Sequence, residues 1–135
     1  MTFHEFLDHT SETVLSLRAA NLPSLLEEAA RALGGIEQAG IAGTGERVVR
    51  RLTVDSTDAA GLLVDFLNEL IWLCETEAAV PRDARVQLSG PASLEAEVAL
   101  ERLAAKPSLV KAATRHDVRV ESSPAGCEAR VTLDV

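Results

Sequence analysis

The sequence contains few of the residues that would indicate a nucleic-acid platform or a membrane anchor. Tyrosine is absent, and the aromatic side chains are three phenylalanines and one tryptophan. Single-stranded RNA and DNA are commonly held by base stacking on aromatic rings, so this scarcity argues against such binding. No stretch approaches the ~18 consecutive apolar residues of a transmembrane helix, and no basic region precedes an apolar run as in a secretory signal. We therefore expect a cytoplasmic protein without a membrane-spanning segment.

Basic residues are too few for a surface that follows phosphates. Asp and Glu number 21 against 13 Lys and Arg, which gives a formal net charge of −8. Strong direct binding of RNA or DNA is not expected from this balance. An acidic surface suits a bound cation, a basic protein partner or solubility alone.

The usual enzyme motifs are also missing. The two cysteines, Cys74 and Cys127, fit no metal-ligand spacing, and Cys74 lies in an apolar helical pattern that is typical of a buried thiol. The glycine-rich stretch 40–45 has neither the lysine nor the preceding strand of a phosphate-binding loop. No serine occupies a nucleophile elbow. We therefore assign no catalytic residue and expect a protein that is not an enzyme.

Hydrophobic periodicity predicts strands and helices in one domain over residues 1–135. Alternating residues predict strands at 3–8, 13–19, 46–54, from 85, 93–101, 109–120 and 127–135, and apolar stripes predict helices at 22–33 and 57–76. Two helices with one broad apolar face each would cover a sheet. The expected class is α+β, with two helices packed on a mixed or antiparallel sheet in a single compact domain.

Local signals set the expected helix ends. Asn21 is a good N-cap for the first helix, and the glycine pair 34–35 is expected to end it, with a flexible loop up to residue 45. Asp55 or Ser56 is expected to cap the second helix, and Pro81 to close the unit that follows it.

The carboxylates provide a candidate metal site. The segment 128–135 alternates as a half-buried strand, which places the Asp134 side chain beside the α-carboxylate of Val135. Asp8 and Glu12 bracket the turn after the first strand. If the two strands are neighbours, three or four oxygens converge on one sheet edge, and all-oxygen ligation favours hard cations such as Ca²⁺ or Mg²⁺. The alternative is that these groups are solvated and bind nothing.

Lys111 is a second candidate, because it interrupts a mostly apolar stretch predicted to be a strand, with His116 at its far end. It could pair with the acidic cluster or reach a partner's phosphate-handling site. A lysine that only protects an edge strand from pairing is the alternative. His4, His9 and His116 are too scattered for a local zinc motif, although a fold could gather them.

Four segments in order resemble the archease family, the small protein activators of RtcB-type RNA ligases. HEFLDHTSE (4–12) is similar to the family's opening, in which an aromatic and an acidic residue precede His-Thr-Ala-Asp. LVDFLNEL (63–70), VKAATRH (110–116) and the closing LDV (133–135) match its Leu-Val-Asp-Trp-Leu-Asn-Glu-Leu helix, its Val-Lys-Ala-Val-Thr-Tyr-His strand and its C-terminus. The resemblance covers nearly the whole chain.

The resemblance implies a bound metal ion, typically calcium, held by Glu12, Asp134 and a main-chain oxygen of Val135, with Mg²⁺ or Mn²⁺ as alternatives. Glu12 stands where the family has aspartate, which moves the carboxylate by roughly one bond length; the flexible coordination of Ca²⁺ tolerates this better than that of Mg²⁺. Ser11 for alanine and Arg115 for tyrosine are further departures.

The resemblance also implies a partner and a role. RtcB-type ligases join RNA ends using GTP and manganese through a guanylylated histidine, and archease-like proteins promote that guanylylation and multiple turnover in tRNA splicing or RNA repair. Lys111, Asp8, His9 and His116 are the expected partner-activating residues. Two alternatives remain: a metal-dependent hydrolase with Asp8 or His9 as general base, and a chaperone-like binding module.

Overall fold

The structure, a computed structural model, describes residues 2–8 and 12–135 and confirms the α+β class. Its elements are, in chain order, β1 (Phe3–Asp8), β2 (Glu12–Ala19), α1 (Leu22–Glu37), β3 (Gly43–Asp55), α2 (Ala59–Glu77), β4 (Ala79–Gly90), β5 (Ser93–Leu103), β6 (Ala112–Ser123) and β7 (Gly126–Asp134). No helix among these residues is both long enough and apolar enough to cross a membrane.

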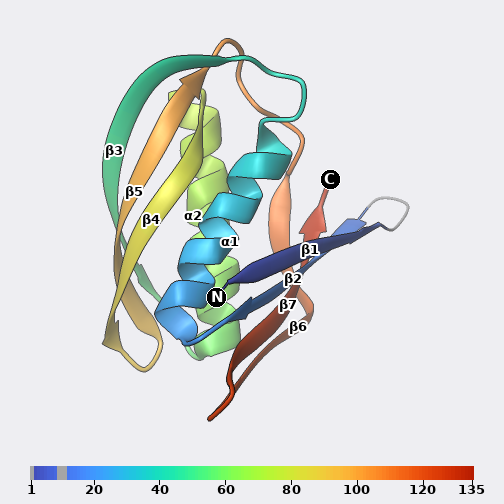
Figure 1. Ribbon diagram of the computed structural model, residues 1–135, viewed down its shortest axis with the longest axis vertical. Helices are drawn as coiled ribbons and strands as arrows, with labels where there is room; N and C mark the ends of the chain where they lie inside the picture. Colours follow the sequence, from blue (N-terminus) through green and yellow to red (C-terminus); the bar gives the residue numbers. More distant parts are fainter. Residues whose placement is uncertain (1, 9–11) are drawn as a thin grey trace.

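The strands form two antiparallel sheets, where the sequence predicted one. The four-stranded sheet has the order β1-β2-β7-β6 and the three-stranded sheet the order β3-β5-β4, with both helices between them (Figure 1). Most of α2 is buried, from Gly61 through Cys74, because the helix is apolar on more than one side and is covered by both layers. The two sheets and two helices share one hydrophobic core.

Helix α1 begins as predicted but continues past its glycine pair. The Asn21 side chain accepts a hydrogen bond from the Ser24 amide at 2.9 Å, as an N-cap should. The prediction that the helix ends at Gly34 and Gly35 is wrong, because it runs to Glu37. Gly34 instead allows a close approach, since a Cβ there would overlap the carbonyl oxygen of Pro81. The expected loop therefore starts later than residue 34.

Helix α2 has a different cap from those predicted. Strand β3 continues to Asp55, and the N-cap is Asp58, whose carboxylate accepts from the Gly61 amide at 2.7 Å. Neither Asp55 nor Ser56 caps the helix, because β3 extends to Asp55, beyond the predicted strand end at residue 54. The predicted apolar stripe is buried throughout (Leu62, Leu63, Phe66, Leu67, Leu70, Ile71, Leu73).

Pro81 lies inside a strand and does not close a unit. It belongs to β4, an edge strand, and the β4–β5 register shifts between Pro81 and Asp83. Proline has no N–H to donate, so an edge position next to a bulge is where a strand accepts it.

Candidate functional site

The candidate site lies at the end of the four-stranded sheet where β2 begins and β7 ends. These strands are antiparallel neighbours, and their register places Glu12 directly opposite Asp134, as the start of β2 and the C-terminal end of β7 in Figure 1 indicate. Opposite residues project from the same face, with Cβ atoms ~4.5–5.5 Å apart. That face is the outer one, because Thr13 and Leu133, which alternate with them, are buried. The expectation that the first and last strands are neighbours is therefore wrong in detail: β2 lies between β1 and β7, so Glu12 and not Asp8 lies opposite Asp134.

Two carboxylates of the same charge therefore lie side by side, and the ion pairs formed within residues 2–8 and 12–135 involve neither of them. Like charges directly opposite each other in a sheet destabilise it. No three His, Cys, Asp or Glu side chains in the described part of the chain come close enough to hold a metal ion. The pair Glu12 and Asp134 offers two side-chain carboxylates, and oxygen donors of this kind suit a hard cation.

Val135 and Lys111 adjoin this pair. The Val135 side chain packs partly buried against the core, which fixes the main chain beside Asp134. The Lys111 amide donates to the carbonyl oxygen of Asp134 at 2.8 Å. Lys111 itself precedes β6, so its predicted place within a strand is wrong: pairing with β7 begins at Ala112, which lies opposite Asp134. The side chain of Lys111 is exposed.

Two side-chain contacts fix β6 against α2. Asn68 accepts from the Ala113 amide at 2.8 Å and donates to its carbonyl oxygen at 3.1 Å. Because β6 is an edge strand, these bonds occupy main-chain groups that no neighbouring strand can pair. Arg115 donates to both carboxylate oxygens of Asp65, at 2.9 and 3.1 Å. No role was predicted for Asn68, which stood out only as a polar residue within an apolar helix and as part of the segment 63–70 that carries the family resemblance.

A buried carboxyl, Glu37, holds the segment that leads to Lys111. One of its oxygens accepts from the Val110 amide at 2.8 Å, while the other is buried without a hydrogen-bond partner among the described residues. Burial raises the pKa of Glu37, and the nearby Glu75 charge adds to the effect. Sequence reasoning missed this residue, because it placed Glu37 in a loop.

The structure does not gather the other candidates at this site. His116 lies in an irregular part of β6, between Thr114 and Arg119 where the register shifts, and its exposed ring contacts Asp117 at 3.2 Å. His4, on β1, contacts Glu28 of α1. His9 lies outside the described residues.

In the backbone register, Asp8 ends β1 opposite Thr13, one position from the pairing of Glu12 with Asp134. His4 contacts a different acidic residue, Glu28. Burial raises the pKa of Glu28, but hydrogen bonds from His4, Thr2 and Arg31 outweigh it, so that the pKa of Glu28 is lowered overall.

The prediction that Cys74 is a buried thiol is confirmed. Cys74 and Cys127 are both buried and free. Burial, together with the nearby Glu37 charge, raises the pKa of the Cys74 thiol, so it is inert.

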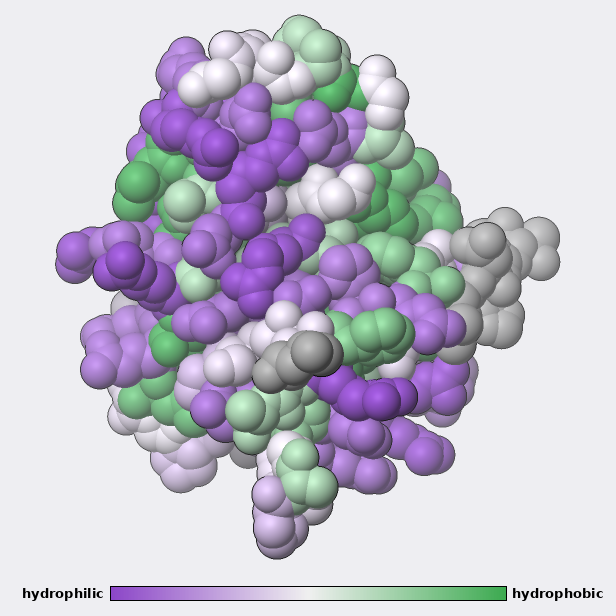
Figure 2. Space-filling view, in the orientation of Figure 1, coloured by the Kyte–Doolittle hydropathy of each residue, from purple (hydrophilic) through white to green (hydrophobic). Residues whose placement is uncertain are grey.

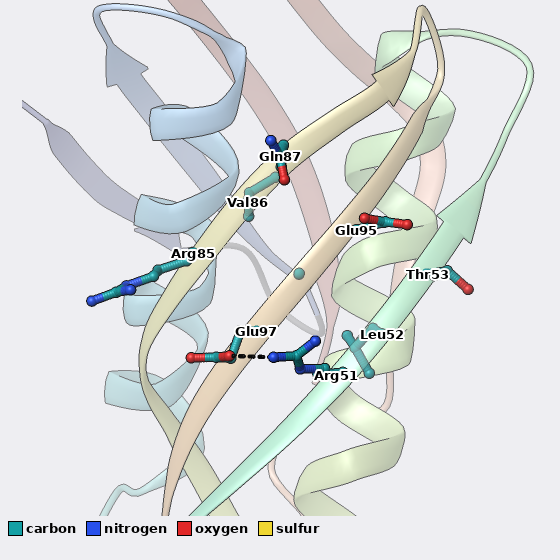
Figure 3. Close-up of a pocket in the computed structure, with 9 residues that line it drawn as sticks. Arg51, Leu52, Thr53, Arg85, Val86, Gln87, Glu95 and Glu97 are labelled. Atoms are coloured by element: carbon teal, nitrogen blue, oxygen red, sulfur yellow. Dashed lines mark hydrogen bonds and ion pairs between the residues drawn. The ribbon is translucent and has the colours of Figure 1, made fainter.

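A hollow of ≈ 670 Å³ on the three-stranded sheet contains none of the predicted site residues (Figure 3). Arg51, Arg85 and Glu97 line it, and Arg51 approaches Glu97 to 3.4 Å. Charges of opposite sign alternate across its strands, so the hollow is a solvated sheet face in which charges offset each other.

The sequence also resembles known proteins. The family described as Archease protein family (MTH1598/TM1083) matches residues 4–135. The archease of Archaeoglobus fulgidus is 30% identical over 138 residues, which cover 98% of this chain and 98% of the relative. The archease of Methanosarcina barkeri is 28% identical over 142 residues, covering 98% of this chain and 95% of the relative.

Two solved structures have the same fold. An archease from Thermotoga maritima, described as a possible chaperone, has a TM-score of 0.68 and 22% identity, covering 96% of this chain and 94% of that one. The solution structure of protein 1598 from Methanobacterium thermoautotrophicum has a TM-score of 0.65 and 22% identity, covering 98% of each chain. With the family match extending over nearly every residue, this chain belongs to the archease family.

Proposed function

We propose that this protein is a non-enzymatic, metal-binding activator of an RtcB-type RNA ligase, acting in tRNA splicing or RNA repair. The observation that carries the proposal is the direct opposition of Glu12 and Asp134 across β2 and β7. A sheet that holds two carboxylates together without an internal cation among the described residues is prepared to bind one. Family membership supports the ligase as the protein that this site serves.

Glu12, Asp134 and a main-chain oxygen of Val135 would hold the cation, with Ca²⁺ the preferred ion and Mg²⁺ or Mn²⁺ the alternatives. When bound, the cation would supply positive charge at an otherwise acidic sheet end. The protein's own residues fix the geometry: the Lys111 amide holds the Asp134 carbonyl, and Asn68 fixes the adjoining strand. Lys111 would present its exposed ammonium group beside the site, within reach of phosphate groups bound by the ligase.

Electrostatics supports a protein partner over RNA. With a net charge of −8, the surface repels a phosphate backbone and attracts the basic surface that an RNA ligase needs for its own substrate. The protein would thus act on the ligase and its GTP site without gripping the RNA.

The test is ligase guanylylation measured with radiolabelled GTP. Substoichiometric protein should accelerate labelling of a cognate RtcB-type ligase and allow several ligation turnovers per ligase, whereas the protein alone should turn over nothing. If even a stoichiometric excess leaves the rate unchanged, the proposal is wrong. Phosphodiester or nucleotide cleavage by the pure protein, lost on Asp134→Ala, would instead support the hydrolase alternative.

The chaperone alternative requires extended exposed apolar surface. On the face in Figure 2, apolar residues form separate patches among hydrophilic ones. Binding of a hydrophobic dye to the native protein at a level typical of chaperones would favour that alternative.

A further inference from the structure

Trp72 is an exposed tryptophan on a helix whose other large apolar side chains are buried. Its exposed fraction is 58%, although α2 packs within the core along most of its length. The large apolar side chains exposed among the described residues are Phe3, Val49, Trp72, Leu88 and Leu109. Phe3 is covered by the Arg18 guanidinium, 5.5 Å from the ring centre, and Val49 and Leu88 belong to the three-stranded sheet. Neither circumstance applies to Trp72 and Leu109, so the exposure of these two side chains needs a different explanation.

The contacts between α2 and β6 place Trp72 at a level along the helix similar to that of Lys111. Asp65 contacts Arg115 and Asn68 contacts Ala113, so the helix and the strand run in opposite directions. One further helical turn, four residues at about 1.5 Å each, leads from Asn68 to Trp72. The two residues from Ala113 back to Lys111, which precedes β6, span at most about 7 Å. The two distances are similar, so Trp72 and Lys111 lie at a similar level along α2.

Leu109 belongs to the same surface. It is 44% exposed, two residues before Lys111. The neighbouring Val110 amide is held by Glu37, whose carboxyl lies close enough to Glu75 for the Glu75 charge to raise its pKa. Segment 109–111 therefore passes the last turns of α2, which include Trp72. The main-chain bond from the Lys111 amide to the Asp134 carbonyl places the end of this segment next to the strand end that carries the candidate metal site.

The charges around Trp72 favour a basic partner. Glu69 and Glu75, three residues before and after it on the helix, are exposed and flank the indole. Protein interfaces commonly centre on a buried tryptophan within a polar rim, and tryptophan is prominent among the residues that dominate binding energy. An apolar centre with an acidic rim is complementary to an apolar recess in a basic surface.

We infer that Trp72 and Leu109 form the apolar centre of the surface through which this protein docks on its ligase, beside Glu12 and Asp134. The inference rests on the proposed function, because the ligase is the occupant to which it commits. Docking here brings the candidate metal site and Lys111 together onto the same region of the partner.

The experiment uses the fact that the chain has one tryptophan and no tyrosine. Protein labelled with 5-fluorotryptophan gives a single fluorine NMR signal, from residue 72, which unlabelled ligase should shift or broaden. In parallel, the dissociation constant is measured by calorimetry for wild type, Trp72→Ala, Leu109→Ala and Trp72→Phe. Val49→Ala is the matched control, because Val49 is 55% exposed on the other sheet.

Trp72→Ala should weaken ligase binding by about tenfold or more, Trp72→Phe less, and Val49→Ala not at all. All variants should melt within a few degrees of wild type, because the substituted side chains are exposed. If wild type accelerates guanylylation but the fluorine signal stays unchanged and Trp72→Ala binds as wild type, the docking inference is wrong and the proposed function stands. If wild type neither binds nor accelerates the ligase, both are wrong.

Discussion

The two sheets treat their carboxylates in opposite ways. On the three-stranded sheet and its neighbours, carboxylates have arginine partners: Arg82 reaches Glu101 at 2.8 Å, and Arg50 reaches Glu77 at 2.9 Å. Hydrogen bonds from these partners help to lower the pKa values of both carboxyls: the Gly45 amide and then Arg82 act on Glu101, and Arg50 acts on Glu77.

At the end of the four-stranded sheet, Glu12 faces Asp134 with no such partner among the described residues. A chain that pairs Glu77, Glu97 and Glu101 with arginines around one sheet leaves two opposed carboxylates at the end of the other. The arginine pairs stabilise the first sheet, whereas under the proposed function the opposed carboxylates at the end of the second sheet would hold an external cation.

The largest expected effect on stability concerns the packing of α1 against β4 of the three-stranded sheet. Gly34→Ala should lower the free energy of unfolding by about 3 kcal/mol, because the new methyl group would overlap the Pro81 carbonyl and force α1 away from β4. Gly35→Ala is the control: nothing lies within 4 Å of a Cβ there, so it should stabilise the helix by about 0.5–1 kcal/mol. Urea denaturation measures both. Equal effects of the two substitutions would contradict the close packing of α1 on β4.

The next prediction concerns the unpaired carboxylates. Asp134→Asn should weaken Ca²⁺ binding by about tenfold or more, because it removes half of the side-chain charge at the site. Isothermal titration and the Ca²⁺-dependent rise in melting temperature measure this change. Asp117→Asn is the control, since Asp117 is an exposed carboxylate at an irregular part of β6 where positive φ suits asparagine. Calcium stabilisation that persists in Asp134→Asn would remove Asp134 from the ligand set.

Replacing Lys111 should reduce ligase activation without reducing the stability of the protein. Lys111→Ala keeps the main-chain bond to Asp134, so the melting temperature should stay nearly unchanged while ligase guanylylation falls several-fold. Lys106→Ala, in the exposed loop before β6, serves as the control for a lost positive charge. A large loss of stability in Lys111→Ala would instead show that the lysine has a structural role.

Glu37 gives a pH test of a buried acid within the core. Its pKa is raised in the folded state, so the folded protein binds a proton more readily there than the unfolded chain does, and this contribution to stability is lost as pH rises above about 4.5. Glu37→Gln removes the titration. The variant should therefore gain stability relative to wild type as pH increases from 4.5 to 8, measured by urea denaturation at several pH values. A constant difference across that range would contradict the raised pKa.

Alternation and apolar stripes predicted the strands and helices well, because burial on one face imposes a period that the sequence displays directly. Turn and cap residues were less reliable. Gly34 fits a helix end as well as a close contact, and Pro81 fits a boundary as well as an edge strand. Which applies depends on the neighbouring element, which the local sequence does not contain.

In the candidate site, too, the features that depend on a distant neighbouring element could not be predicted from the local sequence. The approach of Glu12 to Asp134 could be stated from the sequence only as a condition, because alternation predicts each strand but not which strand lies beside the last one. Asn68 and Glu37 could not be anticipated, since their partners Ala113 and Val110 are 45 and 73 residues away in the sequence. A polar residue that satisfies a distant main chain carries no local sign of its target.

The smallest expected change in stability compares the two sheets directly. The same substitution, glutamate to glutamine, should change the free energy of unfolding in opposite directions in the two sheets. Glu97→Gln removes a carboxylate that pairs with exposed Arg51, so without added metal it should destabilise the protein by about 0–0.5 kcal/mol. Glu12→Gln removes one of two opposed like charges and should stabilise the metal-free protein by about 0.2–1 kcal/mol. Urea denaturation in the presence of chelator, at low and high salt, measures both, and salt should reduce each difference. If Glu12→Gln destabilises the metal-free protein, a cation within the chain already neutralises Glu12, and the contrast between the sheets is wrong.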